Sequence, residues 1–172
     1  MKARRGKKLQ REDVSIEKRQ EIASDLLRKH VMWSMGVGLV PIPLVDFLAV
    51  TGIQLNMLYG MCKIYSVKFS RDVAKNIIAV LIGGILPSSS SRSLASLVKL
   101  VPLVGETVGA MTMPIVSGAS TYAIGKVFIQ HFESGGTFLN FDPAAVKEYF
   151  AEEFRKGKKV SVALGKDNVK QA

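Results

Sequence analysis

The chain has 172 residues, a formal net charge of +10 and 48% hydrophobic residues, which suits one domain with enough mass to bury a core. Its single cysteine, Cys62, excludes an internal disulfide, and no Cys/His cluster has the spacing of a metal site. The basic balance permits nucleic acid or an anionic membrane surface as partner. No nucleic-acid partner is expected, because the basic residues form terminal and loop clusters rather than a face with interleaved aromatic side chains.

Charge is concentrated at the two ends of the chain. Residues 1–30 hold ten Lys/Arg and five Asp/Glu, whereas residues 31–125 hold only six and three. The first eleven residues carry six basic side chains and no acid, a pattern typical of a solvated arm that can contact anionic lipid. The expected organisation is a basic disordered arm over residues 1–14, a helical domain over residues 15–135, and an amphipathic helix with a polar tail over residues 136–172.

The first two helices are predicted on either side of a proline break. Ser15 is expected to cap a helix with an apolar stripe that runs to about Trp33. The next helix is expected from Asp46 to about Tyr65, because the Pro-Ile-Pro segment that ends at Pro43 removes backbone donors. No segment of the chain alternates as a strand for long, so the predicted fold class is all-α.

Further apolar segments follow a basic connector. Ser70 is the expected cap of a third helix that ends near Pro87, and a short helix is expected over residues 92–99. Residues 107–125 form the longest uncharged stretch, and Pro114 inside it predicts a kink or a break.

The last helix is predicted from its turn signals. Ser-Gly-Gly at residues 134–136 is an expected stop, and Asp142 followed by proline is an expected helix start. The polar chain from Gly157 onward is expected to be frayed.

The uncharged stretches are borderline for membrane spans. They are 16, 16 and 19 residues long, against the ~20 apolar residues that a span needs. In two helical hairpins that turn near residues 41–46 and 87–106, 22 of the 24 Lys/Arg fall on one side, as the positive-inside rule requires. The same arrangement places several aromatic residues near that side: Trp33, Tyr65, Phe69, Phe128 and Phe132. We therefore expect a helical membrane-associated bundle in a bacterial inner membrane with cytoplasmic termini; the alternative is a cytoplasmic bundle with basic ends.

Small residues recur at intervals of four positions in the longest uncharged stretch. Such a ridge lets helix backbones approach closely, either within the chain or between copies in a homo-oligomer. Packing within the chain is the favoured interpretation, and Pro114 interrupts the ridge. Its small members are Gly105, Gly109, Ser117, Thr121 and Gly125, with Met113 in register.

Three polar residues stand out in the apolar region. An acid there can mark an ion or proton path, but Asp46 and Glu106 each fall at an expected helix start, where a cap is the favoured interpretation. Gln54 lies further along the same helix as Asp46 and is expected to face a partner helix or another protein.

The sequence gives no sign of catalysis. No phosphate-binding loop is present, because Gly118 to Lys126 has the wrong spacing and Val127 stands where a hydroxyl is required. His30 and His131 have no predicted nucleophile or acid beside them. We therefore expect no enzyme activity, no cofactor and no catalytic, cofactor-binding or metal-ligating residue.

The run Gly36-Val-Gly-Leu-Val-Pro-Ile-Pro-Leu-Val-Asp46, followed by Gln54, Met57 and Tyr65, resembles the YcjF-like, GTPase-associated domain-of-unknown-function family. The resemblance covers residues 15–135, and one departure is Ser66, where such proteins usually place glycine. It implies a helical, membrane-associated module that often follows a small GTPase domain. No catalytic residues carry over from it.

The leading hypothesis is a non-catalytic membrane-associated helical protein, the membrane or partner-binding module of a GTPase-linked system. Its expected partners are anionic lipid of the inner membrane face, a separate GTPase and further copies of the chain. A small transport or pore-forming protein and a soluble all-α adaptor are the alternatives.

Overall fold

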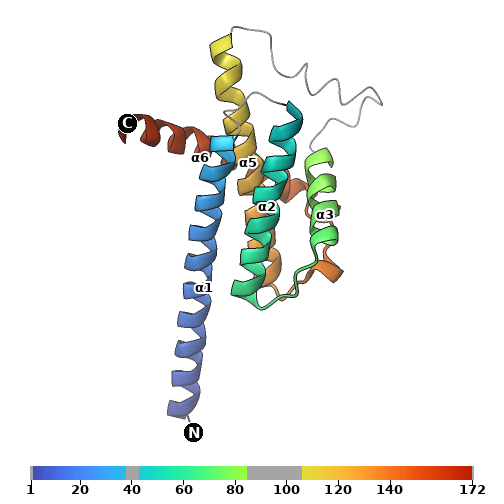
Figure 1. Cartoon of the computed structure of the whole chain (residues 1–172). Helices are drawn as coiled ribbons and strands as arrows, with labels where there is room; N and C mark the ends of the chain where they lie inside the picture. The colour runs from blue at the N-terminus through green and yellow to red at the C-terminus, as the bar shows by residue number, and fades with distance from the viewer. Residues whose placement is uncertain (1, 38–42, 85–105, 172) are drawn as a thin grey trace.

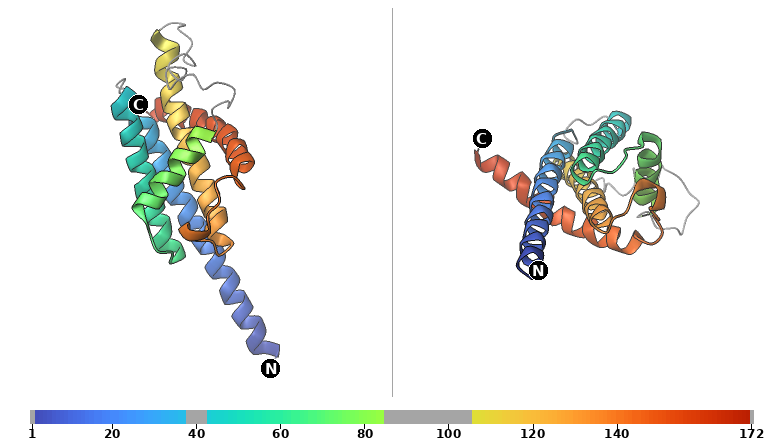
Figure 2. Two further views of the ribbon diagram at one scale, coloured as in Figure 1. Left: turned by 90° about the vertical axis from the view of Figure 1, so that its right-hand side faces the viewer. Right: turned by 90° about the horizontal axis from the view of Figure 1, so that it is seen from below.

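The computed structural model describes residues 2–37, 43–84 and 106–171, which form helices and connecting turns without any strand. The predicted all-α fold class is confirmed. The predicted short helix at residues 92–99 lies outside the described ranges. Four helices form a bundle and a fifth, α6 (Lys147–Gln171), lies across it (Figures 1 and 2). The four are α1 (Lys2–Val37), α2 (Pro43–Tyr65), α3 (Arg71–Gly84) and α5 (Glu106–Glu133).

The four bundle helices alternate in direction, which is the arrangement that two successive hairpins produce (Figure 1). We call the end where α1 and α3 finish and α2 and α5 begin the upper end. The opposite, lower end contains the turn between α2 and α3, and the short 3₁₀ helix η1 (Phe138–Asn140) that follows α5.

The uncharged helical stretches supply the core of the bundle. Large side chains with less than 2% of their surface exposed come from all five α-helices and include Val31, Met57, Ile78, Phe128 and Phe150. Burial of each such side chain stabilises the fold by about 1.5–3 kcal/mol. Below them an aromatic cluster closes the lower end, in which the Phe128 and Phe141 rings stack with their centroids 4.8 Å apart.

Trp33 does not belong to this aromatic cluster. Tyr65, Phe69 and Phe132 lie at the lower end with Phe138, whereas Trp33 lies one turn from the end of α1 at the upper end and contacts the His30 ring. The prediction that all the aromatic residues gather at one boundary is therefore wrong for Trp33.

The first helix is longer than the sequence predicted. It begins at Lys2 rather than at Ser15. Residues 2–14 are therefore helical, where a disordered arm was expected. In Figure 1 this part of α1 extends beyond the lower end of the bundle.

The turn between α2 and α3 shows why related proteins usually place glycine where this chain has Ser66. The helix ends at Tyr65 as predicted, and Ser66 takes a left-handed φ of 57°. The amide of Val67 donates to the Cys62 carbonyl at 2.9 Å, which is the hydrogen bond of a Schellman helix end. Glycine is favoured at such a position because it has no Cβ to clash. Helix α3 then begins directly after Ser70, the predicted cap.

Helix α5 runs from Glu106 to Glu133 without a break at Pro114. Of the two predicted alternatives the break is wrong and the kink stays a prediction; a proline inside a helix removes one backbone donor but does not always end the helix. The predicted stop is confirmed, because α5 ends directly before residues 134–136 and Gly135 takes a φ of 79°.

Helix α6 differs most from expectation. Asp142 accepts a hydrogen bond from the Ala144 amide at 2.9 Å in a turn, and the α-helix itself begins at Lys147. The chain from Gly157 was expected to fray, yet the helix continues to Gln171. The reason is tertiary contact, since Gly157, Ser161 and Leu164 are buried against the bundle.

Across the described ranges, no helix combines the length and the hydropathy that a bilayer crossing requires. The expectation of transmembrane helices is therefore not supported for these residues. Polar residues such as Thr51, Gln54, Ser117 and Thr121 lower the hydropathy of α2 and α5.

Candidate functional site

A polar cluster joins three helices in the interior of the bundle. The Gln54 side-chain amide of α2 donates to Ser120 Oγ at 3.1 Å and to Thr121 Oγ1 at 3.3 Å, both on α5. Thr121 Oγ1 also lies 2.7 Å from Ser34 Oγ of α1, and Ser120 Oγ donates to the Ser117 carbonyl at 2.9 Å. All of these side chains are buried. Gln54 thus faces one partner helix, α5, and Thr121 links it to Ser34 of α1.

The cluster fixes how α1, α2 and α5 sit against one another. A buried hydrogen bond contributes about 0.5–1.5 kcal/mol net, and a buried polar atom left without a partner costs about 1–3 kcal/mol. Gln54 Oε1 is such an atom among the described residues. The cluster contains hydroxyl and amide groups and no ionisable side chain, so what it offers is helix registration rather than acid–base chemistry.

The predicted small-residue ridge is used within the chain where its residues are described. Ser117 and Thr121 are buried on α5, and a Cβ on Gly125 would collide with Leu27 of α1. Met113 is exposed. Gly105 lies outside the described ranges, and Gly109 falls in α5 at a position whose surroundings are not described.

Neither of the two predicted acidic caps stands directly before its helix. Asp46 lies in the first turn of α2, which begins at Pro43 rather than at Asp46, and Glu106 is the first residue of α5. Both positions are near the positive end of a helix dipole, where an acidic residue is favourable.

A second small-residue contact, which the sequence analysis missed, holds α6 across α5. A Cβ on Gly157 would lie 2.9 Å from both Cα and the carbonyl oxygen of Ala119, and a Cβ on Gly118 would meet Ser161 Oγ and Met35. Gly157, Ser161 and Gly165 are spaced by four residues, a pattern that could have predicted this face.

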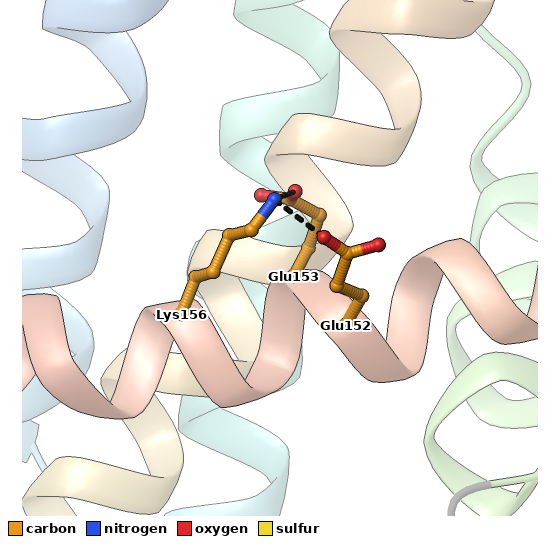
Figure 3. A network of polar contacts seen from close by, with 3 residues as sticks. All are labelled: Glu152, Glu153 and Lys156. Atoms are coloured by element: carbon orange, nitrogen blue, oxygen red, sulfur yellow. Dashed lines mark hydrogen bonds and ion pairs between the residues drawn. The ribbon is translucent and has the colours of Figure 1, made fainter.

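Close to this crossing, one acid of α6 is almost completely buried. Glu153 is 2% exposed and accepts a hydrogen bond from Lys156 Nζ at 2.7 Å, and Glu152 binds the same amine at 2.9 Å (Figure 3). The hydrogen bonds that Lys156 donates to these two carboxylates, to Glu153 first, raise the pKa of Lys156 above its usual value. The bond to Lys156 in turn lowers the pKa of Glu152. One α6 lysine is thus fully engaged by its own helix.

Among the described residues, several exposed apolar side chains lie toward the upper end. Trp33 is 55% exposed near the end of α1, Leu48 is 62% exposed near the start of α2, and Val80 is 57% exposed near the end of α3. Three further exposed apolar residues lie next to Trp33 on α1 or in the upper half of α5. We call the set of six the apolar rim: Met32, Trp33, Leu48, Val80, Met113 and Val116.

Helix α6 brings basic residues to the level of this rim. Its start lies beside the end of α3, where a Cβ on Gly84 would be 4.0 Å from Lys147 Cε. Its far part lies beside the end of α1, where a Cβ on Gly165 would be 3.7 Å from Met35 Cε. Between these points α6 carries Arg155, Lys156, Lys158 and Lys159, all exposed. The predicted two-hairpin arrangement, in which 22 of the 24 Lys/Arg share one side, is therefore wrong for the cations of α6.

The remaining reactive side chains have structural contacts. His30 Nδ1 donates to the Leu26 carbonyl at 2.8 Å, and His131 Nε2 donates to the Thr137 carbonyl at 2.9 Å. Burial raises the pKa of the Cys62 thiol to about 11. In the part of the chain that is described, no group of three or more His, Cys, Asp or Glu could hold a metal ion.

Fold and site define an all-helical bundle with a buried polar cluster, an apolar rim and a basic helix laid across it. The chain belongs to the family described as Domain of unknown function (DUF697), which it matches over residues 2–159. It is also 35% identical over 147 residues to magnetosome membrane protein 22 of Magnetospirillum gryphiswaldense, a match that covers 85% of this chain and 75% of that protein. No solved structure matches the chain.

These matches confirm the resemblance noted in the sequence as far as a family of unknown function. The association of the YcjF-like members with GTPases stays a prediction.

Proposed function

We propose that this protein is a non-catalytic, membrane-associated helical bundle that binds an anionic bilayer surface through its upper end. We further propose that it serves as the membrane or partner-binding module of a GTPase-linked system. The observation that carries the membrane part is the apolar rim with the cations of α6 at its level. The similarity to a magnetosome membrane protein supports it.

The geometry matches what an interface requires of a peripheral protein. Apolar side chains gain free energy when they enter the boundary between headgroups and acyl chains, and an amphipathic basic helix lies at headgroup depth. Each basic residue near an anionic surface adds about 1 kcal/mol of attraction at physiological salt. Because α6 crosses the bundle beside the ends of α1 and α3, its cations would meet headgroups when the rim contacts acyl chains.

Sedimentation with vesicles tests the membrane part. We expect the protein to pellet with vesicles that contain phosphatidylglycerol, and to pellet much less with pure phosphatidylcholine or in high salt. The double variant Trp33→Ser with Leu48→Ser should weaken pelleting. Leu139→Ser is the matched control, because Leu139 is 94% exposed in η1 at the lower end and should not contribute. Equal loss in the control, or no pelleting of the native chain, refutes membrane binding through the upper end and favours an adaptor.

The GTPase part rests on the family resemblance, in which the helical module often follows a small GTPase domain. A separate GTPase would then reach the membrane by binding this chain. Affinity purification from the producing organism should recover a GTP-hydrolysing protein with the chain. Recovery of equal GTPase activity on a mock resin counts against the link.

A further inference from the structure

A groove lies between the end of α3 and the first half of α6. Its volume is about 530 Å³, which falls in the ~300–1,000 Å³ range of sites that hold small ligands. Its apolar wall comes from both helices and includes Val80, Leu81, Phe150 and Phe154. Val80 belongs to the apolar rim, so the groove opens at the upper end of the bundle.

Three cations line the same groove: Lys147, Arg155 and Lys158. None of them has a carboxylate within ion-pair distance among the residues described, whereas the neighbouring Lys156, outside the groove, is bound by two. The Lys158 amine lies 5.2 Å from the centre of the Phe154 ring, which also belongs to the groove. The groove therefore combines an apolar wall with three cations that no carboxylate binds at ion-pair distance among the described residues; Glu152 interacts electrostatically with Arg155.

This combination identifies the class of ligand. Burial of a hydrocarbon chain against an apolar wall contributes favourably to the binding free energy of a ligand. Three cations beside that wall favour a ligand that also carries a phosphate or another anionic group. The segment of this chain at residues 85–105, which follows α3, contains Arg92 and Lys99 and no acid. It would bring like charge to the three cations, so charge complementarity favours an anionic amphiphile over that segment.

We propose that the groove is a binding site for one anionic phospholipid, with an acyl chain against Val80 and Phe154 and with its phosphate on Lys147, Arg155 and Lys158. The proposal rests on the proposed membrane association and specifies it. A lipid held in this way would fix the side of the bundle that faces the bilayer and would give headgroup selectivity that the apolar rim alone does not supply.

The test uses a lipid that needs no bilayer. Dihexanoyl phosphatidylglycerol, below its micelle concentration, is titrated into the full chain and followed by calorimetry, with dihexanoyl phosphatidylcholine as the neutral comparison. We expect saturable binding of one phosphatidylglycerol and much weaker binding of phosphatidylcholine. Arg155→Gln and Lys158→Gln should each weaken binding about fivefold, the equivalent of one lost basic contact. Lys159→Gln is the matched control, because Lys159 is exposed on the same helix and does not line the groove.

A second variant tests the apolar wall. Ala151→Trp fills the groove, since Ala151 lines it, and should abolish binding of the short-chain lipid while vesicle pelleting through the apolar rim persists. Far-UV circular dichroism checks that this variant folds. If Ala151→Trp does not fold, the test depends on Arg155→Gln and Lys158→Gln.

The proposal is overturned if phosphatidylglycerol does not bind, if both headgroups bind equally, or if Lys159→Gln weakens binding as much as Lys158→Gln. Displacement of the lipid by an equal concentration of inorganic phosphate would likewise reassign the site to free phosphate. Vesicle pelleting of the native chain reports separately on the proposed function, so the two can fail independently.

Discussion

The crossing of α5 and α6 predicts opposite effects for the same substitution at two glycines. Alanine is favoured over glycine inside a helix by about 1 kcal/mol, and Gly52 and Gly157 are both helical. A Cβ at Gly52 would meet nothing within 4 Å, so Gly52→Ala should stabilise the fold by about that amount. A Cβ at Gly157 would lie 2.9 Å from the Ala119 backbone, which cannot rotate away. Overpacking of this kind costs about 1–3 kcal/mol.

Both variants gain the same helix propensity from alanine, so the difference between their free energies of unfolding measures the contact between Gly157 and Ala119. We expect Gly157→Ala to be about 1–3 kcal/mol less stable than Gly52→Ala. Urea unfolding followed by circular dichroism measures the difference, and thermal melting should separate the two by about 2–4 °C for each kcal/mol at this chain length. Equal stabilisation by both variants would refute the close packing of α6 on α5.

Three further predictions concern single residues of the bundle. Ser66→Gly should raise the free energy of unfolding by about 1 kcal/mol, because Ser66 holds a left-handed φ of 57°, and a lower urea midpoint would contradict this. Thr121→Val should lower that free energy by about 1–3 kcal/mol, because it keeps the side-chain shape but removes the hydroxyl that bonds Ser34 and accepts from Gln54; an unchanged midpoint would show that the cluster does not stabilise the bundle. Cys62 should react slowly with Ellman's reagent at pH 8 and rapidly in guanidinium, because it is 3% exposed and burial raises its thiol pKa to about 11; equal rates would contradict its burial.

Local signals predicted much of the fold. The start of α3 after Ser70 and the end of α5 before residues 134–136 follow from a cap and from glycines near in sequence, and the end of α2 at Tyr65 falls at the basic connector. The all-α class follows in the same way, because apolar periodicity is a local property.

Tertiary contacts could not be predicted in that way. The chain after Gly157 is polar and contains a glycine, which locally indicates fraying. In the structure this part of α6 is held by α5, because Gly157 lies against Ala119 and Ser161 lies against Gly118. Apolar stretches are equally compatible with lipid and with a bundle core, so hydropathy did not distinguish the two for α2 and α5. The gathering of α6 cations at the upper end depends on the angle at which α6 crosses the bundle, which the sequence does not specify.

Emission from Trp33 tests membrane contact through the upper end most directly. Trp33 is the chain's single tryptophan and is 55% exposed in the apolar rim. Addition of phosphatidylglycerol vesicles should shift its emission to shorter wavelength, and bromine atoms on the acyl chains near the headgroups should quench it. Unchanged emission and no quenching, under conditions where the protein pellets with the same vesicles, would show that the bilayer is bound by another surface.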